Sequence, residues 1–402
     1  MQKNIESLPS EPREFSLTNG GPLFSIERSL GLLPPPTRPP VRLVVVMLVT
    51  TWLPLIVLSV LERLSTGRWD PLILRSEVHI RLLGALVAFL IGEVALEQRC
   101  RTLTRQLARI RTIPREGLFV WQRTLARLAQ IRDAWPFEAL ALGFIYLISL
   151  AAYLGWLAPW ALRWLMPVAH TSGRHWSQAT VVGWWYLVVS QPIFMFVFLR
   201  WLVRWTMFTR LMWCLAALKP RIQASHADRA GGLAFLASPL FALRFLVAGS
   251  GFALTAVWLD EIARSKAQPI IFAADFLTYL VIAMALSVLP YIPFTTLMIR
   301  AKHRALLGYS ALVDGYVEAF NARWIDTAPR PACELLGHAD FTGLADLGKG
   351  FHVTDEMRSN IPGSENLKAN LIASLAPFIL LIPANAQSTV EFLEHAVLKL
   401  LG

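Results

Sequence analysis

Seven apolar stretches, separated by polar and basic segments, constrain this chain more than any other feature. A helix needs about 20 apolar residues to cross the hydrocarbon core of a bilayer. Several stretches reach that length, and flanking residues extend the shorter ones. The pattern predicts an all-α, polytopic transmembrane helix bundle of six or seven crossings. The stretches are residues 43–61, 82–96, 138–160, 181–199, 244–259, 270–299 and 370–386.

Hydrophobic residues make up 55% of the chain and charged residues only 16%, with a mean hydropathy of +0.49. This composition is typical of a lipid-facing surface. The net charge is +11, and the basic residues that produce it are unevenly placed. With the N-terminus inside, the inside segments hold 28 of the 38 lysines and arginines, and the outside segments hold nine. This bias predicts a cytoplasmic N-terminus, and an outside C-terminus if all seven stretches cross.

Charge and proline content divide the chain into four regions. A run of prolines before the first stretch favours a polyproline conformation, so a disordered tail is expected there. After the sixth stretch we expect a helix over residues 300–324 and then a compact loop, because about 40 residues are too few for a separate core. The regions are residues 1–40 (cytoplasmic tail), 41–299 (transmembrane bundle with the basic cytoplasmic loop 97–136), 300–366 (cytoplasmic polar region packed on the bundle) and 367–402 (final membrane segment and C-terminal helix).

Nine arginines fall in the basic loop, residues 97–136. Leu103 and Leu107 recur at helical spacing opposite Arg101 and Arg105, and a similar pattern follows further along the loop. We expect two cytoplasmic amphipathic helices, with arginines toward anionic lipid headgroups and leucines toward acyl chains or neighbouring helices. Nucleic acid is a weaker interpretation, because the loop is tied to the membrane at both ends. The sequence is compatible with a homo-oligomer but does not define one.

Prolines in three predicted crossings are expected to bend or interrupt helices, because proline removes a backbone hydrogen bond. Gln191 precedes Pro192 near the middle of the fourth stretch, and its amide adds a polar group at membrane depth. The sixth stretch contains Pro290 and Pro293. The last stretch is short and also contains two prolines, so it either crosses or dips in and returns.

The most distinctive local string reads H-A-D-R-A-G-G-L-A-F-L and begins at His226. Gly231 and Gly232 permit backbone conformations and close approaches that other residues resist. His226 and Asp228 are two residues apart and can face one ligand if the backbone is not helical. One interpretation is a polar cluster at a cytoplasmic mouth that holds an ion. The other is a turn in which Asp228 caps the following helix and Arg229 meets lipid headgroups.

This string resembles a motif, H-x-D-(R/K)-A-G-G-L-x-F-L, of a group of uncharacterised bacterial polytopic inner-membrane proteins. That group has a proline after the motif histidine where this chain has Ala227, so the resemblance does not extend to a rigid turn there. The resemblance implies a multi-pass protein of the bacterial inner (plasma) membrane and brings no established activity. Other matches are Trp184, Trp185, Tyr186, Pro192, Arg200 and Trp201, with the strings L-L-G-H-A-D at residues 335–340 and L-A-D-L at residues 344–347.

Asp340 and Asp346 are six residues apart and are expected on the same side of the membrane as His226. Together with histidines of that side they are a candidate cation site. The commoner outcome for such residues is solvated loop carboxylates.

Charged residues inside the predicted crossings are a separate group of candidates, because burying a charge in a bilayer is costly and usually serves a purpose. Glu93 lies near the cytoplasmic end of the second stretch, and Asp275 lies a little inside the sixth. Each either lines a polar pathway, pairs with an arginine or reaches the nearest interface. Arg244 interrupts a long apolar run and is expected at the level of the headgroups.

No P-loop, serine-hydrolase motif, zinc-protease motif or CxxC pair occurs in the sequence. The sequence therefore predicts no enzyme activity, no metal and no cofactor. A channel or transporter for a small solute or ion is the leading prediction, because the intramembrane carboxylates require an explanation. The alternative is a non-transporting scaffold or signalling partner that binds lipids or cytoplasmic proteins. A membrane enzyme that uses His226 and Asp228 on a lipid-linked substrate is a third hypothesis.

Overall fold

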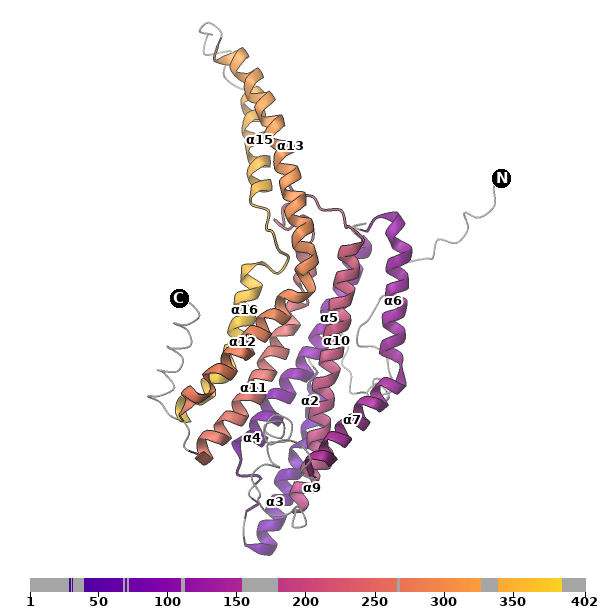
Figure 1. The fold of residues 1–402 in the computed structure, drawn as a ribbon, viewed down its shortest axis with the longest axis vertical. Helices are drawn as coiled ribbons and strands as arrows, with labels where there is room; N and C mark the ends of the chain where they lie inside the picture. Colours follow the sequence, from indigo (N-terminus) through magenta and orange to yellow (C-terminus); the bar gives the residue numbers. More distant parts are fainter. Residues whose placement is uncertain are drawn as a thin grey trace, which may run out of the picture.

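The protein is all-α across the residues that its computed structural model describes. Long helices lie side by side in a bundle, and a pair of helices projects from one end of it (Figure 1). The predicted all-α helix bundle is confirmed. The described residues are 40–67, 69–70, 72–109, 113–153, 180–265, 268–326 and 339–384, with Ser29 and Gly31.

Five helical runs are long and apolar enough to cross a membrane, and a bent helix pair is a sixth candidate. The bent pair consists of Leu118–Asp133 and Glu138–Ala151, which meet at 46°. Runs of this length and composition are those of a multi-pass membrane protein. The five runs are Val41–Thr66, Ser76–Leu107, Val181–Ala217, Ala234–Ala263 and Ile270–Trp324.

The first run is made of two helices that meet at Trp52, and its valines and leucines are largely exposed, as a lipid-facing helix requires. The next two runs each contain a π-helical turn. Pro192 follows the second of these turns, so the irregular turn falls where the proline ring would clash with a regular helix. The elements are α2 (Val41–Thr51), α3 (Leu53–Thr66), α4 (Ser76–His79), the π-turn η1 (Ile80–Ala85), α5 (Leu86–Arg109), α9 (Val181–Trp185), the π-turn η5 (Tyr186–Ser190) and α10 (Gln191–Ala217).

The second crossing is longer at both ends than the sequence predicts. It begins at Ser76 rather than at Leu82, so residues 76–81 are helical and do not belong to an outside loop. At the other end α5 continues to Arg109, and Leu103 and Leu107 are buried in the core of the bundle. The predicted separate amphipathic helix at the start of the basic loop is therefore wrong.

The rest of the basic loop forms the 3-10 turn η2 (Arg115–Gly117) and α6 (Leu118–Asp133), which lies beside α10 (Figure 1). Trp121 and Leu128 of α6 are buried, whereas Arg123 and Arg127 are exposed. This helix has the predicted amphipathic pattern, with its apolar side against protein. α7 (Trp135–Tyr153) then turns toward the opposite end of the bundle (Figure 1).

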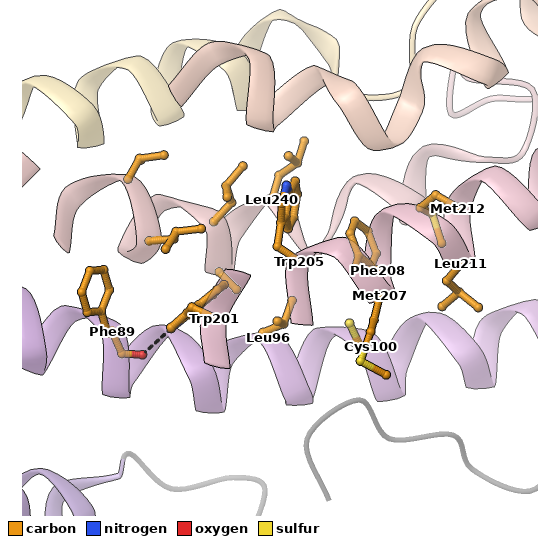
Figure 2. Packing of buried hydrophobic residues seen from close by; sticks show 14 of the residues in the cluster. Phe89, Leu96, Cys100, Trp201, Trp205, Met207, Phe208, Leu211, Met212 and Leu240 are labelled. Carbon is orange, nitrogen blue, oxygen red and sulfur yellow. Dashed lines mark hydrogen bonds between the residues drawn. The ribbon is translucent and has the colours of Figure 1, made fainter. Parts of the chain in front are cut away.

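The 3-10 turn η6 (Ala234–Ala237) leads into α11 (Leu240–Ser265), which packs against α5. Phe89 of α5 lies directly over Gly249 of α11, where an ideal Cβ would be 2.4 Å from a ring carbon. The Phe89 ring is fixed from the α10 side by aromatic neighbours. Figure 2 shows the adjoining part of this core, formed by Leu96, Cys100, Trp201, Trp205, Met207, Phe208, Leu211, Met212 and Leu240.

The helix pair that projects from the bundle consists of α13 and α15, and we call it the arm (Figure 1). The predicted helix at residues 300–324 is confirmed as part of α13, and the chain is interrupted at Pro290 as expected. The predicted compact loop is wrong, because residues 339–355 form α15, which extends away from the bundle beside α13. The elements are the 3-10 turn η7 (Pro269–Phe272), α12 (Ala273–Val288), the 3-10 turn η8 (Leu289–Tyr291), α13 (Ile292–Trp324) and α15 (Ala339–Asp355).

α16 (Gly363–Leu375) and the 3-10 helix η9 (Ala376–Ala384) run along α11. Asn370 and Phe378 are fully buried in this packing. The segment is not among the helical runs long and apolar enough to cross a membrane, and its helical form changes to 3-10 at Ala376. The predicted N-terminal tail, apart from Ser29, Gly31 and Pro40, lies outside the described residues. Residues 154–160 of the third stretch and residues 385–402 also lie outside them.

Gly249→Ala is expected to destabilise the protein by about 1–3 kcal/mol, because the Phe89 ring has no room to move away from an added methyl group. Gly308→Ala is a matched control on the arm, where an added Cβ meets nothing within 4 Å and should be neutral or stabilising. Thermal unfolding in detergent compares them. Equal unfolding midpoints for the two variants would contradict the described α5–α11 contact.

Candidate functional site

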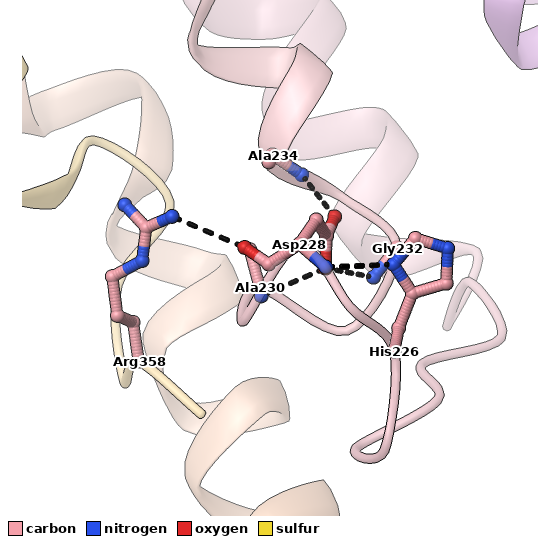
Figure 3. A network of polar contacts seen from close by, with 6 residues as sticks. All are labelled: His226, Asp228, Ala230, Gly232, Ala234 and Arg358. Carbon is pink, nitrogen blue, oxygen red and sulfur yellow. Dashed lines mark hydrogen bonds and ion pairs between the residues drawn. The ribbon is translucent and has the colours of Figure 1, made fainter. Parts of the chain in front are cut away.

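The carboxylate of Asp228 is the centre of the loop that contains the His226 string (Figure 3). Its Oδ1 accepts hydrogen bonds from the backbone N–H groups of Ala230 and Gly232 at 2.9 and 3.0 Å. Its Oδ2 accepts one from the N–H of Ala234, the first residue of η6, at 3.0 Å. Nδ1 of His226 lies 2.9 Å from Oδ1. Asp228 thus caps the following helical turn, as the turn interpretation expects.

Burial alone would raise the pKa of Asp228, but the N–H groups of Gly232, Ala230 and Ala234 and the His226 ring outweigh it and hold this pKa below its usual range. The charged carboxylate is therefore the form that the loop stabilises. The Asp228 oxygens already accept three backbone hydrogen bonds. Asp228 therefore stabilises the loop, and this role requires no bound ion.

The backbone of this loop takes left-handed conformations that few residues adopt. Gly231 and Gly232 have φ of 67° and 85°, and Arg229 has φ of 54°. An ideal Cβ on Gly231 would lie 2.3 Å from Cγ2 of Ile222, so this position also requires glycine for space. The two glycines therefore serve loop geometry, as the sequence suggests.

The loop holds the segment that joins α15 to α16. The backbone N–H of Arg358 donates to the carbonyl of Arg229 at 2.8 Å, and its Nη2 donates to the carbonyl of Asp228 at 3.1 Å. The Arg229 guanidinium pairs with Glu356 at 3.0 Å. Glu356 also lies 3.2 Å from Nε2 of His352. Arg229 therefore meets a carboxylate at the base of the arm, and the expectation that it also meets headgroups stays a prediction.

Asp340 and Asp346 lie elsewhere, toward the tip of the arm. Asp340 accepts from Nε1 of Trp324 at 3.0 Å and pairs with Arg323 at 3.0 Å, while Asp346 pairs with Lys349 at 3.2 Å. α15 rises about 1.5 Å per residue, so Asp340 is roughly 24 Å from Glu356 at the base. The structure does not bring these carboxylates to His226. In the described part of the chain no three His, Cys, Asp or Glu side chains form a group that could hold a metal ion.

Glu93 of α5 lies between two arginines of α10. Its Oε2 is 2.6 Å from Nη2 of Arg200, and its Oε1 pairs with Nη1 of Arg204. All three side chains are at most 10% exposed. Of the alternatives that the sequence leaves open for Glu93, the structure shows pairing with arginine. One carboxylate and two guanidinium groups have a formal net charge of +1.

A second buried group, which we call the outer cluster, lies at the two π-turns. Arg81 donates to Oε1 of Gln191 at 3.3 Å and lies 3.5 Å from Oε1 of Glu77. The hydroxyl of Tyr186 donates to the same Gln191 oxygen at 3.0 Å. None of the four residues is more than 3% exposed. Gln191 is therefore part of a polar network and not an isolated amide.

The outer cluster and the Glu93 group lie between the same two helical rods, α4–η1–α5 and α9–η5–α10, with an aromatic layer separating the two groups. Phe89 is within 5.9 Å of the Phe194 ring and 5.6 Å of the Phe198 ring. The Nε1 of Trp201 donates to the Phe89 carbonyl at 2.8 Å (Figure 2). Arg81 and Glu93 are twelve positions apart, which is about 18 Å along a helix. Two charged layers are thus separated by an apolar one.

The remaining candidates are not joined to these clusters. Asp275 is exposed in the first turn of α12, where the helix dipole favours a negative charge. Arg244 lies in the second turn of α11 and donates to Oδ1 of Asn366 at 3.2 Å. Among the described residues, no hydrogen bond or ion pair joins Glu93 or Asp275 to His226.

Glu77 and Arg81 are not among the candidates from the sequence, because the apolar stretches place residues 62–81 in an outside loop. The available signal was helical spacing: Glu77 and Arg81 are four residues apart, and Val78, Leu82 and Ala85 follow the same period. Arg200 and Arg204 are also four apart, but the apolar stretches place both in an inside segment and not within a crossing.

No protein-family model, curated protein or solved structure matches this chain. The resemblance of the His226 string to a group of bacterial membrane proteins therefore stays a prediction.

Asp228→Asn should loosen this loop, because the amide cannot accept all three backbone hydrogen bonds. Since the folded pKa of Asp228 is lowered, its contribution is present above roughly pH 4 and is lost as the pH falls through the folded pKa. Hydrogen exchange at Ala230, Gly232 and Ala234 should be about tenfold faster in the variant near neutral pH. Asp346→Asn, an exposed control, should leave these amides unchanged. Unchanged exchange in Asp228→Asn would contradict the capping role.

Proposed function

We propose that this membrane protein moves a small ion across the bilayer along the interface between the α4–η1–α5 rod and the α9–η5–α10 rod. The outer cluster carries this proposal, because its four polar residues are removed from water inside a bundle of membrane-spanning helices. Ionisable residues in such places mark ion pathways and proton relays. We also propose a bacterial inner membrane with the N-terminus inside, on the strength of the arginine distribution and the resemblance of the His226 string.

Stability alone does not account for the outer cluster. Replacing a buried ion pair by well-packed apolar residues of similar volume is often neutral or stabilising. The Glu77–Arg81 pair also recruits Gln191 and Tyr186 from the opposite rod. A network that joins two helices by polar contacts can rearrange in discrete steps, which apolar packing does not offer.

The two π-turns provide a place for such a step. A π-turn holds one more residue than a regular helical turn, and π-turns occur frequently at functional sites. Moving that extra residue along the helix rotates the adjoining side chains by about 100°. The Val188 carbonyl within η5 accepts a hydrogen bond from Tyr146 of α7 at 3.0 Å, so a change in this turn would alter a contact with a neighbouring helix. We propose that the aromatic layer around Phe89 closes the pathway between the two charged layers.

The arm supports a second candidate function, a scaffold that presents α13 and α15 to another protein. Leu307 and Leu312 of α13 are 61% and 55% exposed, and the arm extends beyond the bundle (Figure 1). Under this proposal the bundle is an anchor and the ion pairs only hold it together. Ion flux distinguishes the two functions, because an anchor carries none.

The test is flux through purified protein in liposomes, under imposed gradients of protons, potassium and chloride. Tyr186→Phe should lower the flux about tenfold, because it removes one hydrogen bond from the buried network while preserving its volume. Tyr309→Phe on α13 is the matched control and should conduct normally. Replacing residues 309–350 by a short flexible linker should leave flux intact, since the arm is outside the proposed pathway.

Wild-type protein that passes none of these ions would remove the transport proposal and leave the scaffold. Equal flux in Tyr186→Phe and Tyr309→Phe would show that the outer cluster is not on the pathway. Unfolding midpoints of all variants establish that any loss of flux is not a loss of folded protein.

A further inference from the structure

Two arginines from different helices lie against one phenylalanine ring at the start of α11. Cζ of Arg99, on α5, is 4.9 Å from the centre of the Phe241 ring. Cζ of Arg244, one turn further along α11, is 5.4 Å from the same centre. Phe241 is 38% exposed and Arg99 is exposed, so the group is accessible from outside the bundle.

Neither guanidinium is in an ion pair with any described carboxylate. The hydrogen-bond partner of Arg244 is the neutral side chain of Asn366, at 3.2 Å. This differs from the neighbouring arginines, since Arg101 pairs with Glu97, and Arg200 pairs with Glu93. Two positive charges on one ring repel each other, and cation–π contacts offset only about 1 kcal/mol each. An anion between them would remove the repulsion.

The position of the group adds to this argument. α11 begins at Leu240, and the positive end of its dipole favours an anion near the turn that contains Phe241. The N–H groups of Phe241, Ala242 and Leu243 donate to the carbonyls of Ser238 and Pro239, so the arginines are the donors of the site. On α5, the apolar sequence of the crossing ends at Leu96 and is followed by Glu97, Gln98 and Arg99. That change in polarity is expected where a helix leaves the hydrocarbon core.

We propose that Arg99, Phe241 and Arg244 form a binding site for a phosphate group, the chemistry that an anionic lipid headgroup and free phosphate share. Guanidinium groups bind phosphate oxygens through two parallel hydrogen bonds, and the dipole of α11 favours the same charge. The Asn366 amide lies beside Arg244 and holds its guanidinium in place. The site uses none of the residues of the proposed ion pathway, so either proposal stands without the other.

The experiment titrates detergent-purified full-length protein with phosphatidylglycerol and with phosphatidylcholine of the same chain length, using native mass spectrometry. Arg99→Gln and Arg244→Gln should each weaken phosphatidylglycerol binding about fivefold, and the double variant should weaken it further. Arg123→Gln, which removes an exposed arginine of α6, is the matched control and should bind as the wild type does. Phosphatidylcholine should bind more weakly to the wild type and respond less to the variants.

The same variants are titrated with inorganic phosphate and followed by phosphorus NMR, which separates the two sources. Weaker lipid binding assigns the site to a headgroup, and weaker phosphate binding with unchanged lipid binding assigns it to the free anion. If Arg99→Gln and Arg244→Gln match Arg123→Gln in both titrations, the proposal is wrong. Arg244→Lys keeps the charge and should retain most of the binding. Should Arg244→Gln fail to fold, the exposed Arg99→Gln still decides the question.

Discussion

A charge inside a bilayer has to find a partner on a neighbouring helix, because no water is available there to solvate it. In this protein such pairs connect the α4–η1–α5 rod to the α9–η5–α10 rod. Glu93 of α5 is held by Arg200 and Arg204 of α10, and Arg81 is held by Glu77 of its own helix and by Gln191 of the opposite one. The apolar core around Phe89 fills the space between the two charged layers. α11 packs against the first of these rods, and α6 and α7 pack against the second.

At one end of the bundle the His226 loop connects the membrane helices to the arm. Asp228 accepts three backbone hydrogen bonds and so fixes a loop with left-handed residues at Arg229, Gly231 and Gly232. The carbonyls that this conformation turns outward bind Arg358, at the point where the arm returns to the bundle. The most distinctive string in the sequence is therefore a structural clamp between membrane helices and arm. The ion pair of Arg229 with Glu356, which also lies beside His352, fixes the position of the base of the arm.

Much of the fold could be predicted from the sequence, because apolar length and proline position act locally. Five of the seven predicted stretches, the interruption at Pro290 and the helix over residues 300–324 all follow from such signals. α15 could not be predicted in this way, since Gly343 and Gly350 read as loop residues. In the structure they make room for the rings of Tyr316 and Tyr309 of α13, so tertiary packing overrides local preference. Of the candidate site, Glu93, Gln191 and Asp228 were found by residue type. Their partners could not be found in this way. Pairing across helices depends on which helix faces are in contact, and a single sequence does not specify those contacts.

The pairing of Glu93 with Arg204 is tested most directly by a double-mutant cycle on the free energy of unfolding, measured in detergent or bilayers. Glu93→Gln leaves two buried arginines facing each other and should cost about 3–5 kcal/mol. Glu93→Gln combined with Arg204→Gln should be more stable than Glu93→Gln alone, because the second change removes one of those charges. Asp275→Asn, at an exposed carboxylate, should change stability by about 0.5 kcal/mol or less. A double variant whose loss equals the sum of the single losses would contradict the pairing of these rods.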